Sequence, residues 1–217
     1  MKSFKLGLMV LALASTGSML RADDAKAKCD GVCAADGACC SVTAGMAKLP
    51  KIAYMVGDES LCCEESAKAV AAAKKSKMVY VVGTEKFDSS DKAFVGLVDQ
   101  TEKFVSAFAT PTTCNVSGTT TIAGECLTCN VQAAEVAAKV KKAMDVVAIS
   151  YKVGEKSCSC PVEAKALAAA DKKAKTLFVV AGEETECEQT ARLNLARAKY
   201  KAALMAMAPA KTETKVQ

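Results

Sequence analysis

Closely spaced pairs of cysteines are the residues of this chain best suited to chemistry. The 217-residue sequence contains 12 cysteines and no histidine. Thiolates are the form in which cysteine binds soft cations such as Cu(I) and Zn²⁺. The predicted metal ligands are three pairs, Cys62/Cys63, Cys126/Cys129 and Cys158/Cys160. No catalytic residue and no organic cofactor site is expected.

The amino-acid composition limits which metal ions and which catalytic mechanisms these cysteine pairs could support. Without histidine, thiolate is the only soft ligand besides methionine, which favours Cu(I) over Cu(II). One pair suits a linear Cu(I) site, and two converging pairs suit a tetrahedral Zn²⁺ site. The lack of histidine also excludes Ser-His-Asp triads and Cys–His nucleophilic pairs, and no glycine-rich phosphate loop is present. We therefore expect a non-enzymatic protein.

Two other uses of the thiols stay open. An exported chain with an even number of cysteines in each half can form structural disulfides, which would make it a stapled structural or interaction protein of the cell envelope. The third alternative is thiol–disulfide exchange. That activity is typical of Cys-x-x-Cys on a thioredoxin-like βαβ unit, and only Cys126 and Cys129 have this spacing.

A short repeat must position these thiols. A Gly or Ala is followed six residues later by Cys and four residues after that by Ala. The clearest copies are Gly57–Cys63–Ala67 and Gly154–Cys160–Ala164. Looser copies are Ala34–Cys40–Ala44, Ala123–Cys129–Ala133 and Ala181–Cys187–Ala191, and Gly83–Ser89–Ala93 lacks the thiol. Such a repeat indicates one small supersecondary unit used several times.

Each unit is predicted to be strand, turn, short strand and helix. Runs of β-branched and aromatic residues predict strands at 52–56, 78–82, 146–153 and 176–180. Short returning strands are expected at 59–61, 85–87, 156–158 and 184–186. The longest helices are expected at 90–109 and 188–208. The repeated cysteine then stands at a helix N-terminus, where the helix dipole favours a thiolate: Cys63, Cys129, Cys160 and Cys187.

The predicted fold class is α+β. A lone hairpin with one helix cannot bury its apolar face, so two units should pair into an antiparallel sheet covered by helices. The run from Tyr54 to Gly57 matches the run from Tyr151 to Gly154, which favours two related halves. A boundary near Pro111 gives Cys-rich halves at 23–110 and 111–210, with a disordered tail at 211–217.

Part of this unit resembles known metal-binding modules. The segment from Ser150 through Cys158 and Cys160 to Ala164 resembles the strand–loop–helix of heavy-metal-associated domains, the copper-chaperone family. That family has Cys-x-x-Cys after Gly-Met, whereas only Cys126/Cys129 has this spacing here. The stretch from Tyr54 to Cys63 is more distantly similar to YHS and TRASH modules. Both resemblances imply binding of a soft metal ion through the paired cysteines.

The first 22 residues resemble a secretory signal peptide. Lys2 and Lys5 precede the apolar run 6–14, which is too short to span a bilayer, and Ala22 is the expected cleavage site. Removing this segment lowers the formal net charge from +5 to +2. The chain has no Trp and only three Arg, which disfavours nucleic-acid binding. We expect a periplasmic or extracellular protein without a membrane span, whose partner is a metal ion or another protein.

Overall fold

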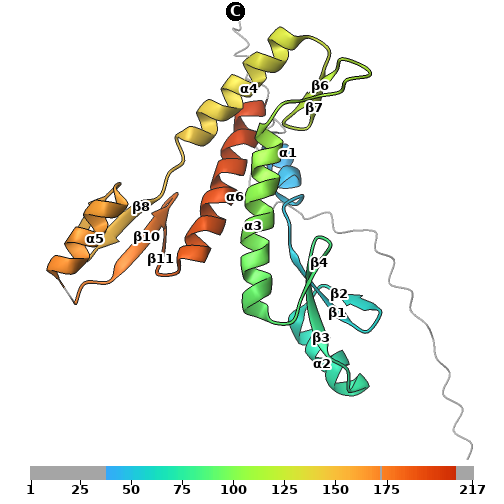
Figure 1. Cartoon of the computed structure of the whole chain (residues 1–217), viewed down its shortest axis with the longest axis vertical. Helices are drawn as coiled ribbons and strands as arrows, with labels where there is room; N and C mark the ends of the chain where they lie inside the picture. The colour runs from blue at the N-terminus through green and yellow to red at the C-terminus, as the bar shows by residue number, and fades with distance from the viewer. Residues whose placement is uncertain (1–37, 172, 209–217) are drawn as a thin grey trace, which may run out of the picture. The chain divides into compact units, whose positions relative to one another are not determined.

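The computed structural model describes the backbone of residues 38–171 and 173–208, shown in colour in Figure 1. The expected signal peptide and the expected tail both lie outside these residues. So do the cysteines before residue 38.

Helices and antiparallel strands alternate along the described chain, so the predicted α+β class is confirmed. The helices are α1 (Ala38–Met46), α2 (Glu64–Lys74), α3 (Ser90–Ala109), α4 (Asn130–Asp145), α5 (Pro161–Ala170) and α6 (Glu188–Met207). The strands are β1 (Ile52–Val56), β2 (Glu59–Leu61), β3 (Met78–Val82), β4 (Glu85–Phe87), β5 (Thr112–Thr113), β6 (Thr120–Ile122), β7 (Glu125–Leu127), β8 (Ser150–Val153), β9 (Lys156–Cys158), β10 (Thr176–Val180) and β11 (Glu183–Thr185).

Two hairpins pair to form each four-stranded sheet, as predicted. The first sheet has the order β2-β1-β3-β4 and the second has the order β11-β10-β8-β9. Tyr54 lies opposite Tyr80 in the first sheet, and Tyr151 lies opposite Phe178 in the second. The ring centroids are 5.6 Å apart in both pairs. Tyr54 and Tyr151 thus hold the same place in their units, while the relation of the two complete halves stays a prediction.

The first position of the repeat is a turn residue with positive φ. Gly57, Gly83 and Gly154 have φ of +63°, +58° and +61°, whereas Ala123 and Ala181 adopt +51° and +49°. Each begins a two-residue hairpin loop, for which positive φ is required. The aliphatic residue just before each turn is at most 4% exposed: Val56, Val82, Ile122, Val153 and Val180. The turn therefore follows a residue anchored in the core.

The second and third positions begin a helix. The amide of Ala67 donates to the carbonyl of Cys63 at 3.0 Å, and Ala164 does the same to Cys160. A spacing of four residues is that of the first helical hydrogen bond. The alanines of the five described units are at most 4% exposed. Their small side chains let the first helical turn lie close against its neighbours.

Some element boundaries differ from the sequence prediction. The strand expected at 146–153 begins only at Ser150, because α4 continues to Asp145 and Val146 is its C-cap. The hairpin β6–β7 before Cys129 was not predicted, since its two strands have only three residues each. Cys40 is the third residue of α1 rather than the residue before a helix. The last returning strand starts one residue early, at Glu183.

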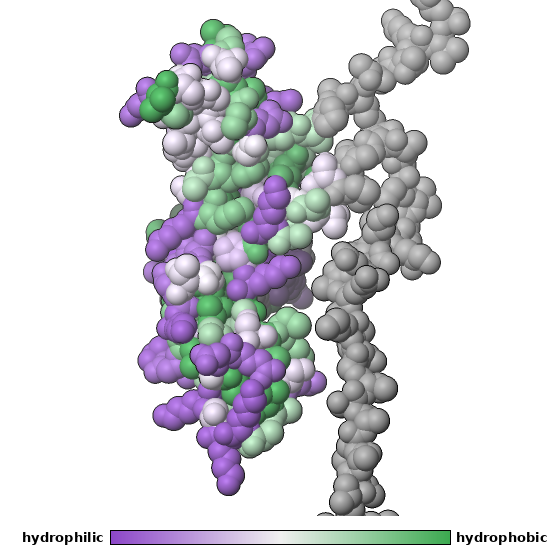
Figure 2. Space-filling model, turned by 90° about the vertical axis from the view of Figure 1, so that its right-hand side faces the viewer, coloured by the Kyte–Doolittle hydropathy of each residue, from purple (hydrophilic) through white to green (hydrophobic). Residues whose placement is uncertain are grey.

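The long helix α6 packs against α1, α3 and α4 (Figure 1). Arg192 on α6 donates to Glu102 at 2.6 Å and to Asp99 at 3.1 Å, both on α3. Tyr200 on α6 belongs to a buried cluster with Leu49 and Val105. Apolar and charged residues lie side by side over the view in Figure 2. Among the described helices, none combines the length and the apolar character needed to cross a membrane.

Exchanging Gly and Ala at the turn position should change stability in opposite directions at Gly57 and Ala181. Gly57→Ala should cost about 1 kcal/mol, because a Cβ at positive φ approaches its own backbone. A Cβ at Gly57 would meet nothing else within 4 Å. Ala181→Gly should instead stabilise the fold by roughly 0.5 kcal/mol, since relief of strain exceeds the added chain entropy. Urea unfolding measures both. The control is Ala166→Gly on the exposed side of α5, which should cost about 1 kcal/mol. Destabilisation by Ala181→Gly would contradict the prediction.

Candidate functional site

Four cysteines cap helices, as the repeat predicted. Cys63, Cys129, Cys160 and Cys187 are the N-cap residues of α2, α4, α5 and α6. All four have extended backbone dihedral angles and exposed side chains. The fifth described unit has Ser89 at the cap of α3. Each thiol therefore lies at the positive end of a helix and is accessible from solvent.

Two of these caps hold their thiols in an activating environment. The pKa of Cys63 is lowered, first by the backbone N–H of Ser66 and then by that of Glu65. The pKa of Cys187 is lowered mainly by the hydroxyl and the backbone N–H of Thr190. Both partners stand three residues after the cysteine, where the third amide of the helix points back at the cap. A hydroxyl at this position adds a second donor to the thiolate.

Cys114 is a thiol that the sequence analysis missed. It lies in the loop between β5 and β6 and is exposed. The hydroxyl and the backbone N–H of Ser117, followed by the N–H of Val116, lower the pKa of Cys114 to about 7. The shared signal is Cys followed three residues later by Ser or Thr. Among the eight cysteines described with side chains, that pattern identifies Cys63, Cys114 and Cys187 without any metal-site spacing.

The structure places the members of each predicted pair differently. Cys158 is half-buried at the end of β9, a position that Leu61 and Phe87 occupy in the first sheet. Burial and the nearby carboxylate of Glu163 raise the pKa of Cys158. Its sulfur lies 3.7 Å from the backbone oxygen of Cys160. The two residues thus share one short loop before α5.

The other two pairs are less favourably arranged for chelation. Cys126 is the middle residue of β7, with its sulfur 3.6 Å from the hydroxyl of Thr121. Cys62 directly precedes the extended cap residue Cys63. Cys62 itself lies in a bend, so no regular strand holds these two adjacent thiols relative to each other.

The pairs do not converge on one another. Within the residues that the structure describes, no three side chains of Cys, Asp or Glu come together in a way that could hold a metal ion. The eight cysteines described with side chains are all free thiols. A four-sulfur Zn²⁺ site is thus not assembled by this part of the chain, and each pair would act as a separate two-sulfur site.

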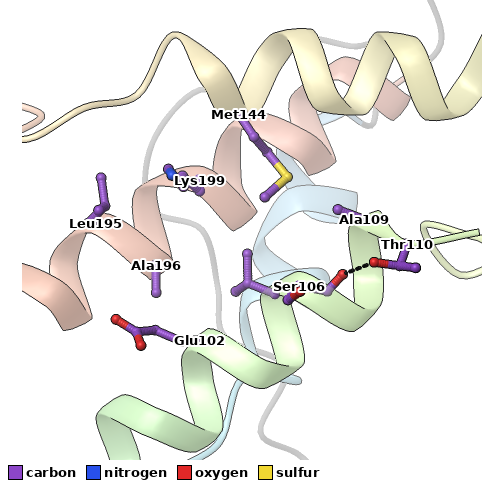
Figure 3. A pocket seen from close by; sticks show the side chains of 9 residues that line it. Glu102, Ser106, Ala109, Thr110, Met144, Leu195, Ala196 and Lys199 are labelled. Atoms are coloured by element: carbon purple, nitrogen blue, oxygen red, sulfur yellow. Dashed lines mark hydrogen bonds between the residues drawn. The ribbon is translucent and has the colours of Figure 1, made fainter.

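A hollow of about 370 Å³ lies between α3 and α6 (Figure 3). Val105, Met144 and Leu195 contribute apolar walls, and the hydroxyl of Thr110 donates to the carbonyl of Ser106 at 2.8 Å. The carboxylate of Glu102 at its edge is already engaged by Arg192. None of the eight cysteines described with side chains lines this hollow. It is therefore separate from the candidate thiol sites.

Comparison with known proteins finds no matching family, no matching characterised protein and no matching solved structure. The local resemblances to heavy-metal-associated, YHS and TRASH modules stay predictions.

Proposed function

We propose that this is an exported, non-enzymatic repeat protein that binds a soft metal ion through pairs of thiolates at helix N-termini. Cu(I) is the preferred ion, because two thiolates satisfy its linear coordination. Each binding event releases the protons of two thiols to solvent. Zn²⁺ would require four sulfurs, and hence pairs from two units or two molecules.

The proposal rests on the loop before α5. Cys158 and Cys160 stand two residues apart, and Cys160 has extended backbone angles. Ser159 between them lies in a bend, so the chain turns from β9 toward α5 at this pair. The 3.7 Å approach of the Cys158 sulfur to the Cys160 backbone keeps the two thiols in one loop. We therefore place the first Cu(I) site at this pair, and further sites at Cys62/Cys63 and Cys126/Cys129.

The exposure of the cysteines supports metal binding over a purely structural role. Cys62, Cys63, Cys126, Cys129 and Cys160 are exposed, and none of them belongs to the buried clusters. A structural disulfide needs only one cysteine at each of the two positions that it joins, whereas a linear Cu(I) site needs two cysteines close together. Pairs that recur at one point of a repeated unit fit the second requirement.

The decisive measurement is a titration of the reduced protein with Cu(I) against a competing chelator. Cys158→Ser/Cys160→Ser should lose about one tightly bound equivalent, since the linear site needs both sulfurs. The Cys62→Ser/Cys63→Ser variant tests the second site in the same way. The matched control is Cys114→Ser/Cys187→Ser, which also removes two exposed thiols but breaks no pair. It should keep the full Cu(I) stoichiometry of the parent protein.

The outcomes separate the three uses of the thiols. Equal, weak binding by all four proteins would contradict the proposal and favour disulfide staples. Equal losses in the pair variants and the control would show that only the number of thiols matters. A count of free thiols in protein taken from its native compartment complements the titration. Near-zero free thiols without bound metal would support a stapled envelope protein, and a redox-dependent mixture would support thiol exchange.

A further inference from the structure

Helices cover one face of the first sheet, and no helix among the described residues packs on its other face. Both α2 and α3 pack on this sheet. The covered face has Tyr54, Tyr80 and Val82, which contact the core of α3 or lie beside α2. Because strand residues alternate between faces, Ala53, Met55, Val79 and Val81 lie on the other side. We call these four half-buried residues, together with Lys86, the open face.

The open face is apolar at its centre and cationic at its edge. Met55 lies directly opposite Val79, and Ala53 lies opposite Val81. Lys86 lies beside Val81 on the edge strand β4. Lys51 and Lys77 are exposed and immediately precede β1 and β3.

These lysines are not neutralised by the sheet that holds them. The described strands of the first sheet contain two carboxylates, Glu59 and Glu85. They lie opposite Val56 and Val82, on the helix-covered side. Among the described residues, no ion pair involves Lys51, Lys77 or Lys86. The open face therefore presents uncompensated positive charge around apolar side chains.

The second sheet provides an internal comparison. At the place of Met55 it has Lys152, and at the place of Lys86 it has Glu184. These two side chains form an ion pair of 2.8 Å across the open side of that sheet. Lys175, the counterpart of Lys77, pairs with Glu186 at 2.7 Å. Ion pairs thus neutralise the lysines on the exposed side of the second sheet, whereas the equivalent side of the first sheet stays cationic and apolar.

We propose that the open face of the first sheet docks on the surface of an anionic lipid bilayer. Lys51, Lys77 and Lys86 would contact anionic head groups around the centre of this face, while Met55 and its neighbours leave water. Pairing with the same face of a second copy would bring like charges together. A protein partner would need carboxylates at fixed positions and an ordered network of polar contacts on this face. A fluid anionic bilayer needs neither, so it suits a face that lacks such a network.

The test compares binding to vesicles of phosphatidylglycerol and phosphatidylcholine with binding to phosphatidylcholine alone. Each lysine near an anionic surface strengthens binding about fivefold, so Lys77→Gln/Lys86→Gln should lower the partition coefficient by about 25-fold. Met55→Lys/Lys86→Glu gives this face the ion pair of the second sheet, and it should also weaken binding strongly. The control is Lys152→Gln/Lys175→Gln, with the same change of charge on the second sheet. Its binding should match that of the parent protein.

All variants keep the same amino-terminal residues, so any contribution of the apolar run 6–14 is common to them. Equal loss in the control would show that net charge alone drives binding, which overturns the proposal. Binding that no open-face variant alters, or no binding to anionic vesicles, would also overturn it. If the same lysines instead bound soluble poly-glutamate while vesicles were ignored, the partner would be an acidic protein and the bilayer proposal would be wrong.

Discussion

Replacement of Tyr200 by alanine is expected to remove about 4 kcal/mol from the free energy of unfolding. This side chain on α6 is only 1% exposed. Its ring makes edge contacts with Phe104 and Phe108 of α3, with centroids 5.3 and 4.8 Å away. Its hydroxyl donates to the carbonyl of Gly45 in α1 at 3.3 Å. One side chain thus ties three helices together, and its loss leaves a cavity among them.

Tyr200→Phe separates the packing of the ring from the hydrogen bond. It keeps the aromatic contacts and should cost about 1 kcal/mol, because the Gly45 carbonyl loses its donor. Val146→Ala, at a side chain that is 80% exposed, should change stability by less than about 0.5 kcal/mol. Urea unfolding followed by circular dichroism measures all three. A loss below about 1 kcal/mol for Tyr200→Ala would mean that these helices do not depend on this contact.

Cys114 is expected to react with iodoacetamide with a pH midpoint near 7. The pKa of Cys114 is lowered to about 7 by the hydroxyl and N–H of Ser117 and by the N–H of Val116. The thiolate is the reactive form, so the alkylation rate should rise as the pH increases through 7 and level off above it. Mass spectrometry of the labelled peptides resolves each cysteine. Cys158, whose pKa is raised by burial and by Glu163, should reach its midpoint at a higher pH.

Ser117→Ala removes the largest cause of the lowered pKa. The midpoint of Cys114 should then move upward by on the order of one pH unit, while that of Cys158 should stay in place. Ser66→Ala should shift the midpoint of Cys63 in the same direction, although less, because the backbone N–H of Ser66 is the larger cause there. An unchanged Cys114 profile in Ser117→Ala would refute the proposed role of the hydroxyl.

Local sequence rules predicted the repeated unit well. The strands 52–56, 78–82 and 176–180, the helix 90–109 and the caps at Cys63 and Cys160 are all confirmed. A turn residue with positive φ, a cap and a buried alanine act within ten residues of chain. The conformational preferences of these residues are strong enough to be predicted without knowing which elements pack against them. The hairpin β6–β7 was missed because its two strands have only three residues each and give no hydrophobic run.

The thiol sites were predicted only in part. The cap positions follow from the repeat, but the lowered pKa of Cys63 and of Cys187 also depends on the residue three positions later, Ser66 and Thr190 respectively. The pKa of Cys158, which ends β9, is instead raised by burial and by the carboxylate of Glu163. The spacing of Cys62 and Cys63 suggested one site, but Cys62 lies in a bend beside the extended cap residue Cys63, so no regular strand fixes the two thiols relative to each other.

The sequence alone determined the repeated unit and the four cysteines that cap its helices, because hydrogen bonds between residues close in the chain set both. The tertiary structure decided which hairpins pair, how α3 and α6 meet through Arg192, and that the cysteine pairs of the described units stay apart. It also left Met55 and Val79 on an open face, while Lys152 pairs with Glu184 on the other sheet. Those outcomes depend on contacts between residues far apart in sequence, which spacing within one unit does not encode.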